Sequence, residues 1–226
     1  MSMDQDKVVC GTEDILRSLC NSVTRVLSAA TQGQVRYSGM VQRINKTCLK
    51  PDIGCFVLFD GGFSGLVVMN FSANAAMELY RDYLLSMGMS ASDLATNYTA
   101  DEVSNVMGEL VNQILGDFTG MVARELQTDI TQNQPKMLAL NKQVTLSVDT
   151  QLDRPEARRV TFYTPGNNIF YLELAIDHTE FIKLHDFEVA EAPDPDSLLE
   201  QAGKQAKHTA SSAEDDNDAL LKSLGM

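Results

Sequence analysis

Apolar residues recur every three or four positions along residues 99–127, which indicates the buried face of a long α-helix. Thr99 and Glu102 have the spacing of a capping box, so this helix is predicted to begin at Thr99. The apolar positions of the face are Val103, Val106, Met107, Leu110, Ile114, Phe118 and Met121. The pattern therefore predicts a long helix packed along one side.

The opposite face of the same helix has an unusual composition. It carries one carboxylate and two amides, from Glu109, Asn105 and Asn112. The glycines close around them are Gly108, Gly116 and Gly120. Each glycine inside a helix costs about 1 kcal/mol relative to alanine, so a solvated face would be cheaper without them. The glycines predict a close approach, either by a neighbouring element of the same domain or by another molecule.

The remaining pattern places a helix, three strands and a second helix before the long helix, and three strands after it. The predicted helices cover residues 12–31 and 73–86, and the predicted strands cover 35–47, 53–60, 63–71, 136–148, 159–163 and 169–176. Ser72 is expected to cap the second helix, and Gly88 to end it. This order is α+β, and its simplest layout is a mostly antiparallel sheet with helices packed on one face.

The first helix weakly resembles the long one. Aligning Asn21 with Asn112 places Ser18 where Glu109 stands. The similarity is either a decayed internal repeat or chance between two amphipathic helices. In both cases the acid is missing from the first copy.

The composition changes after residue 187. Residues 188–213 are acidic, contain two prolines and have little to bury, so we predict a disordered linker after a domain at 1–187. Residues 214–226 turn apolar again and predict a short amphipathic peptide with Asp218, Leu220, Leu221 and Leu224. Such a peptide is unstable alone and folds onto a partner or onto its own domain.

Composition excludes several function classes. The 226 residues are 44% apolar, which suits one globular domain with a tail. The net charge of −13 and the lack of a Lys/Arg cluster argue against nucleic acid and anionic membranes as partners. The four cysteines form no C-x-x-C pair, and the three histidines lack paired ligand spacing, so we expect no metal or cofactor of its own. No Ser or Cys lies in a nucleophile motif, which argues against a nucleophilic hydrolase. Because the cysteines show no disulfide pattern, we expect a cytoplasmic protein.

The polar face and a later proline share a spacing with a known family. Asn105-x3-Glu109-x2-Asn112-x22-Pro135 resembles the signature Asp/Ser-x3-Glu-x2-Asn-x22-Pro of the CheC/CheX/FliY response-regulator phosphatases. Three of the four defined positions agree, and Asn105 departs. Because Ser18 replaces the acid of a second site, the chain is most similar to the single-site CheX kind. The resemblance also implies a homodimer paired through the sheets.

The resemblance implies a phosphorylated CheY-like receiver as partner, which itself holds Mg²⁺. Asn112 would position a water at the aspartyl phosphate, and Glu109 would pair with the receiver's lysine. Asn105, Gly108 and Gly116 would be secondary contacts.

Pro135 would be structural, setting the loop that flanks the site. The departure at Asn105 leaves open a non-catalytic adaptor that binds a receiver without hydrolysing its phosphate.

The C-terminal peptide is similar to the CheY-binding tail of CheZ and to the acidic peptide of FliM. A linker of about 25–30 residues spans roughly 25–33 Å and would hold a bound receiver near millimolar effective concentration. We therefore predict that deleting residues 211–226 raises the KM for phosphorylated receiver more than it lowers kcat. Steady-state kinetics of the truncated chain test this, and an unchanged KM would refute the tether.

Overall fold

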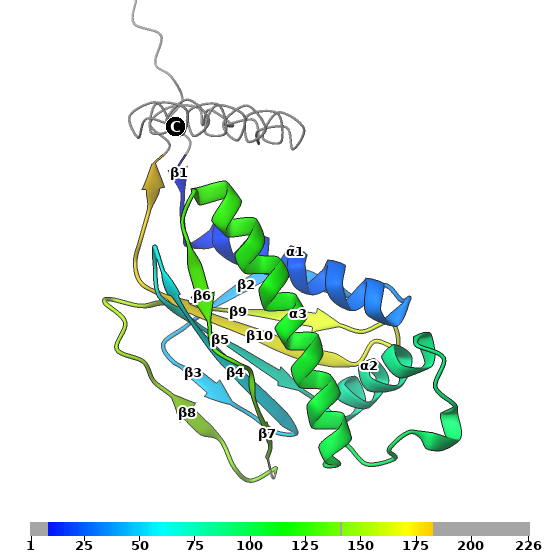
Figure 1. Cartoon of the computed structure of the whole chain (residues 1–226). Helices are drawn as coiled ribbons and strands as arrows, with labels where there is room; N and C mark the ends of the chain where they lie inside the picture. The colour runs from blue at the N-terminus through cyan, green and yellow to red at the C-terminus, as the bar shows by residue number, and fades with distance from the viewer. Residues whose placement is uncertain (1–8, 141, 183–226) are drawn as a thin grey trace, which may run out of the picture. The chain divides into compact units, whose positions relative to one another are not determined.

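The computed structural model describes residues 9–140 and 142–182. Figure 1 shows a twisted sheet with helices on one side. The helices are α1 (Thr12–Thr31), α2 (Ala73–Ser86) and α3 (Asp101–Leu126), with a 3₁₀ turn, η1, at Ala91–Asp93. The strands are β1 (Val9–Cys10), β2 (Arg36–Ile44), β3 (Thr47–Leu49), β4 (Ile53–Gly61), β5 (Gly65–Phe71), β6 (Ile130–Gln132), β7 (Lys136–Ala139), β8 (Leu146–Val148), β9 (Glu156–Tyr163), β10 (Ile169–Ile176) and β11 (Phe181–Ile182).

The main sheet has the strand order β2-β9-β10-β5-β4-β6, and β7 also pairs with β4. Its neighbouring strands are antiparallel, as in β4 against β5, where Ile53 lies opposite Phe71. Two further two-stranded sheets join β1 to β11 and β3 to β8. The predicted α+β fold, with a mostly antiparallel sheet and helices on one face, is confirmed.

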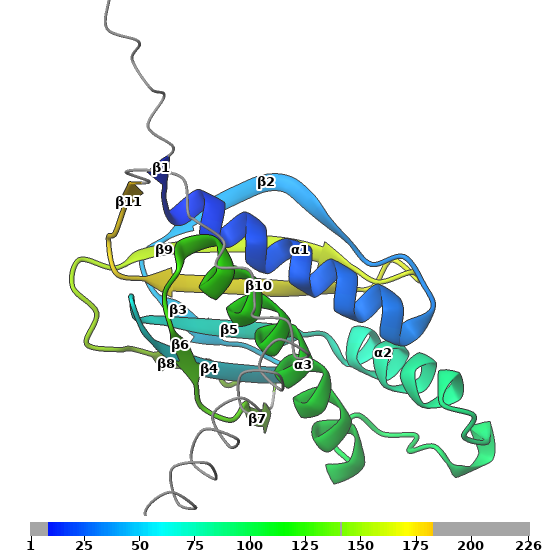
Figure 2. The same cartoon turned by 45° about the horizontal axis from the view of Figure 1, so that its top comes forward.

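The helices cover one face of the main sheet, where the large core lies (Figures 1 and 2). Along β5, Val67, Met69 and Phe71 point into this core. Leu66 and Val68 point the other way, into a smaller apolar cluster with Leu49 of β3 and Leu140. Both faces of β5 are therefore buried, which is why residues 66–69 read as a continuous apolar run.

Helix α2 begins and ends as predicted. The Ser72 hydroxyl accepts a hydrogen bond from the Ala75 N–H at 3.2 Å, and Gly88 follows the helix with φ of 87°. Glycine adopts this left-handed conformation at little steric cost, so the helix stops there.

The predicted start of α3 is wrong by one residue. The N-cap is Ala100, and no side chain caps it, so the capping box of Thr99 and Glu102 does not form. Instead, the Asn97 side chain accepts a hydrogen bond from the Thr99 N–H at 3.1 Å and holds the turn before the helix.

The buried face of α3 is also shifted from the predicted one. Val106 and Met121 are half-buried, whereas the packed positions also include Val111, Leu115 and Val122.

The strand prediction for 136–148 is wrong. That segment divides into β7, which pairs with β4, and β8, which pairs with β3 in a separate sheet. The alternation of apolar residues carries no information about which strand will be the partner. The short strands β1, β6 and β11 were not predicted. Each is too short to show a pattern of its own and is stabilised by pairing with a strand that is distant in the sequence.

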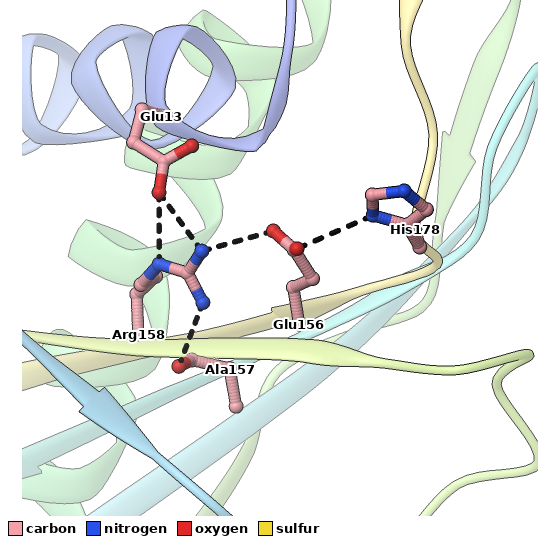
Figure 3. A network of polar contacts seen from close by, with 5 residues as sticks. All are labelled: Glu13, Glu156, Ala157, Arg158 and His178. Carbon is pink, nitrogen blue, oxygen red and sulfur yellow. Dashed lines mark hydrogen bonds and ion pairs between the residues drawn. The ribbon is translucent and has the colours of Figure 1, made fainter.

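A polar cluster connects α1 to the sheet (Figure 3). Arg158 is only 6% exposed, and its Nη2 donates to Glu13 at 2.8 Å and to Glu156 at 2.9 Å. His178 Nδ1 lies 3.2 Å from the Glu156 carboxylate. A hydrogen bond from Thr12 lowers the pKa of Glu156, and the charge of Arg158 acts in the same direction. The first turn of α1 is thus tied to the start of β9.

A second cluster holds β3 against the opposite face. Glu173 of β10 is fully buried, and its Oε1 accepts from Arg159 Nε at 2.8 Å. Its Oε2 accepts from the Cys48 N–H of β3 at 2.9 Å. Asn70 of β5 donates to the Cys48 carbonyl at 2.9 Å and accepts from the Lys50 N–H at 2.7 Å.

We predict that Glu173→Ala lowers the free energy of unfolding by about 3 kcal/mol, because it leaves a guanidinium and a backbone N–H without their acceptor. Urea unfolding followed by circular dichroism measures the change. The control Glu180→Ala alters an exposed carboxylate and should stay within about 0.5 kcal/mol of the wild type. Equal effects of the two substitutions would contradict the role of Glu173.

Candidate functional site

Helix α3 places Asn105, Glu109 and Asn112 on its exposed side. Consecutive helical residues are about 100° apart, so these three positions fall within one narrow sector. Met107 and Leu110, which are fully buried, face the sheet instead. The same packing that fixes the helix therefore directs the three polar side chains outward.

Each of the two principal side chains is contacted by a glutamine. Gln113 Nε2 donates to Glu109 Oε1 at 3.0 Å, one turn further along α3. Gln132 Nε2, from β6, donates to Asn112 Oδ1 at 3.3 Å. The acid and the amide are thus one helical turn apart, and each accepts a hydrogen bond from a glutamine.

Pro135 lies in the connection between β6 and β7 and is half-buried. Both strands pair with β4 and run beside α3 (Figure 1). The proline therefore lies between Gln132, which bonds Asn112, and Met137, which lies near Gly108.

The glycines of α3 lack a packing reason in the described parts of the chain. A Cβ added to Gly108 would lie 3.5 Å from Met137 Cγ, an ordinary contact, and one added to Gly116 or Gly120 would meet nothing within 4 Å. Alanine would fit at all three positions. The sequence offered two explanations for these glycines, a close neighbour in the same domain or another molecule. Among the described residues, no neighbour of the same domain requires a glycine at these positions.

Asn105 stands apart from the other two polar residues because it lines a groove between α2 and α3. The groove has a volume of about 320 Å³. Its walls are Tyr80, Leu84, Met89, Asp93, Glu102, Asn105 and Val106. Asn105 is thus positioned at the rim of the candidate site.

A second groove of about 430 Å³ lies between the three helices and includes Gln113 in its lining. Arg25 of α1 forms an ion pair with Asp117 of α3 across it. Burial acts to raise the pKa of Asp117, but hydrogen bonds and the charge of Arg25 outweigh it, so the pKa is lowered.

The α1 counterpart of the site is incomplete. Asn21 is exposed, as Asn112 is, but its Oδ1 accepts a hydrogen bond from the Tyr37 hydroxyl at 3.2 Å. Ser18 supplies no carboxylate. The face of α1 therefore lacks the acid and amide pair found on α3.

The sequence analysis did not identify two residues that contact the candidate site, Gln113 and Gln132. Gln113 could have been found, since it follows Glu109 by four residues on a helix. Gln132 could not, because only the pairing of β6 with β4 brings it to α3.

Residues 9–140 and 142–182 contain no cluster of three or more metal-binding side chains. None of the helices in these ranges combines the length and the apolar content of a membrane span. The predicted linker and the tail residues Asp218, Leu220, Leu221 and Leu224 lie outside the described residues.

Solved structures with a similar fold come from bacterial chemotaxis. The chemotaxis protein CheX from Desulfovibrio desulfuricans aligns with a TM-score of 0.60 and 18% identity, covering 73% of this chain and 99% of that one. CheX in a CheX–CheY–BeF₃–Mg²⁺ complex from Borrelia burgdorferi gives 0.55 and 15%, covering 73% and 99%. FliY from Thermotoga maritima gives 0.51 and 17%, covering 71% and 84%. The fold is therefore that of the CheX, CheC and FliY proteins.

Sequence comparison gives a separate result. No match is found among curated proteins. One family model, described as a protein of unknown function, DUF3334, matches residues 6–226. Because this match spans nearly the whole chain, the protein belongs to the DUF3334 family.

Proposed function

We propose that this protein accelerates the dephosphorylation of a CheY-like receiver domain by docking the exposed face of α3 on the phosphorylated site. The observation that supports this most strongly is that Glu109 and Asn112 are exposed one turn apart on α3, with Asn112 bonded to Gln132 of β6. The spacing of Glu109, Asn112 and Pro135 agrees with the phosphatase signature on a matching fold.

The proposed reaction requires only one chemical contribution from this chain. A phosphorylated receiver carries its own aspartyl phosphate, lysine and Mg²⁺, so a phosphatase has only to place a water in line with the phosphorus. The Asn112 amide has the donor and acceptor groups to hold that water. The Glu109 carboxylate is the complement of a receiver lysine and would fix the docked orientation.

The lack of side chains at Gly116 and Gly120 is consistent with a partner surface lying close along α3. CheX of known structure has been solved bound to CheY with Mg²⁺, which supports a receiver as the partner class. Glu109 and Asn112 offer too few ligands to bind a metal ion by themselves. In the proposed reaction the metal ion therefore comes with the partner.

A non-catalytic adaptor is the second candidate, and Asn105 favours it because the signature has Asp or Ser there. An adaptor would bind the phosphorylated receiver without changing its decay. The two candidates differ in one observable, the rate of phosphate loss with and without this protein.

We predict that Asn112→Ala lowers the accelerated dephosphorylation about 100-fold, because it removes the amide that is proposed to hold the attacking water. Glu109→Ala should chiefly raise KM, since it removes a docking contact. Phosphate release from a receiver phosphorylated with acetyl phosphate measures both. The residues are exposed, so unfolding free energies should change by less than about 0.5 kcal/mol.

The matched control is Glu125→Ala, which removes an exposed carboxylate from the last turn of α3, away from the Asn112 sector. It should leave both kinetic constants unchanged. Full activity in the Asn112→Ala variant would reject the mechanism, and wild-type binding without acceleration would favour the adaptor.

A further inference from the structure

Gln132 is the last residue of β6 and reaches the candidate site from the sheet. It lies opposite Phe59 in the β4–β6 register, and the Phe59 side chain is in the core beneath the helices. Opposed residues of an antiparallel pair point to the same face. The Gln132 side chain therefore points toward α3, where its Nε2 donates to Asn112 Oδ1.

The backbone that carries Gln132 is firmly attached. The next residue, Asn133, makes two hydrogen bonds with Leu58 of β4, one from its N–H to the Leu58 carbonyl and one from the Leu58 N–H to its Oδ1, both 3.1 Å long. Thr131, on the other side, bonds the Asp60 carbonyl at 3.2 Å. Gln132 thus presents its amide from a fixed position, not from a free loop.

The same amide has an unpaired end. Gln132 Oε1 is buried and has no hydrogen-bond partner among the described residues. A buried acceptor without a donor destabilises the folded state. Folding alone therefore gives no reason for a glutamine here, since an apolar side chain of equal length would avoid this cost.

We propose that Gln132 is a positioning residue for Asn112, an inference that rests on the proposed phosphatase function. Asn112 is exposed on a helix surface and would otherwise sample several rotamers. The bond to Oδ1 restricts its amide, while Nδ2 and the second lone pair of Oδ1 stay available to a water. Restricting the Asn112 side chain in this way is useful only if its orientation matters for the reaction.

The test is Gln132→Met in the full chain, because methionine keeps the length and removes both polar groups. With a CheY-like receiver phosphorylated by acetyl phosphate and Mg²⁺, we expect kcat to fall about threefold to tenfold, the worth of one ordinary hydrogen bond. KM should stay within twofold, since docking contacts are unchanged. The unfolding temperature should stay equal or rise, because the unpaired Oε1 is gone.

This combination separates positioning from a structural role. A residue needed for folding would lower kcat and the unfolding temperature together. The matched control is Gln134→Met, the same substitution at an exposed position two residues further along. It should change neither quantity.

A second measurement needs no partner. ¹⁵N relaxation of the Asn112 side-chain amide should report greater mobility in Gln132→Met than in the wild type or in Gln134→Met. Equal mobility in all three would overturn the proposal. So would an unchanged kcat in Gln132→Met while Asn112→Ala abolishes activity, a result that leaves the phosphatase function standing. If the wild type accelerates nothing, the phosphatase function fails, and the relaxation data alone decide whether Gln132 holds Asn112.

Discussion

The packing of α3 on the main sheet is the constraint on which the rest of the site depends. Met107, Leu110, Ile114 and Phe118 are fully buried, so the helix cannot rotate without exposing a large part of the core. Because residues three and four apart share a face, fixing this stripe also fixes where the others point. Glu109 and Asn112 are outside because their neighbours are inside.

The sheet contributes more than a support. Strands β6 and β7 both pair with β4 and lie beside α3. Gln132 is the last residue of β6, and Pro135 lies in the connection to β7. On the opposite face, Glu173 and Asn70 hold β3 over β5, which closes the second side of the central strand. The candidate site thus lies beside a sheet whose central strand, β5, is covered on both faces.

Local signals in the sequence were enough for much of this fold. Helices α1 and α2 have the predicted bounds, because each has an amphipathic stripe and α2 is also marked by the Ser72 cap. Strand β10 was also predicted with its observed bounds, since Pro165 and Gly166 mark the turn before it. The polar face of α3 followed from periodicity alone, because helix geometry converts spacing into direction.

Other features depended on pairing between distant segments. The division of 136–148 between β7 and β8 is set by two different partner strands, which apolar alternation cannot identify. Gln132 reaches Asn112 only because β6 pairs with β4 in one register. The start of α3 was missed because Asn97 and not Thr99 provides the local hydrogen bond. A capping-box pattern states that a bond could form, and the turn geometry decides whether it does.

The exposed Glu109 and Asn112 side chains, the CheX-like fold and the position of β6 beside α3 support the proposal that the α3 face docks a phosphorylated receiver. The most direct measurement is an NMR titration of the ¹⁵N-labelled chain with a CheY-like receiver, with and without BeF₃⁻ and Mg²⁺, which together mimic the phosphorylated state. We expect amide shifts at Glu109, Asn112 and Gly116 and along β6 and β7, stronger with the mimic present. Shifts confined to α1 or to strand β2, with α3 unaffected, would contradict docking through this face.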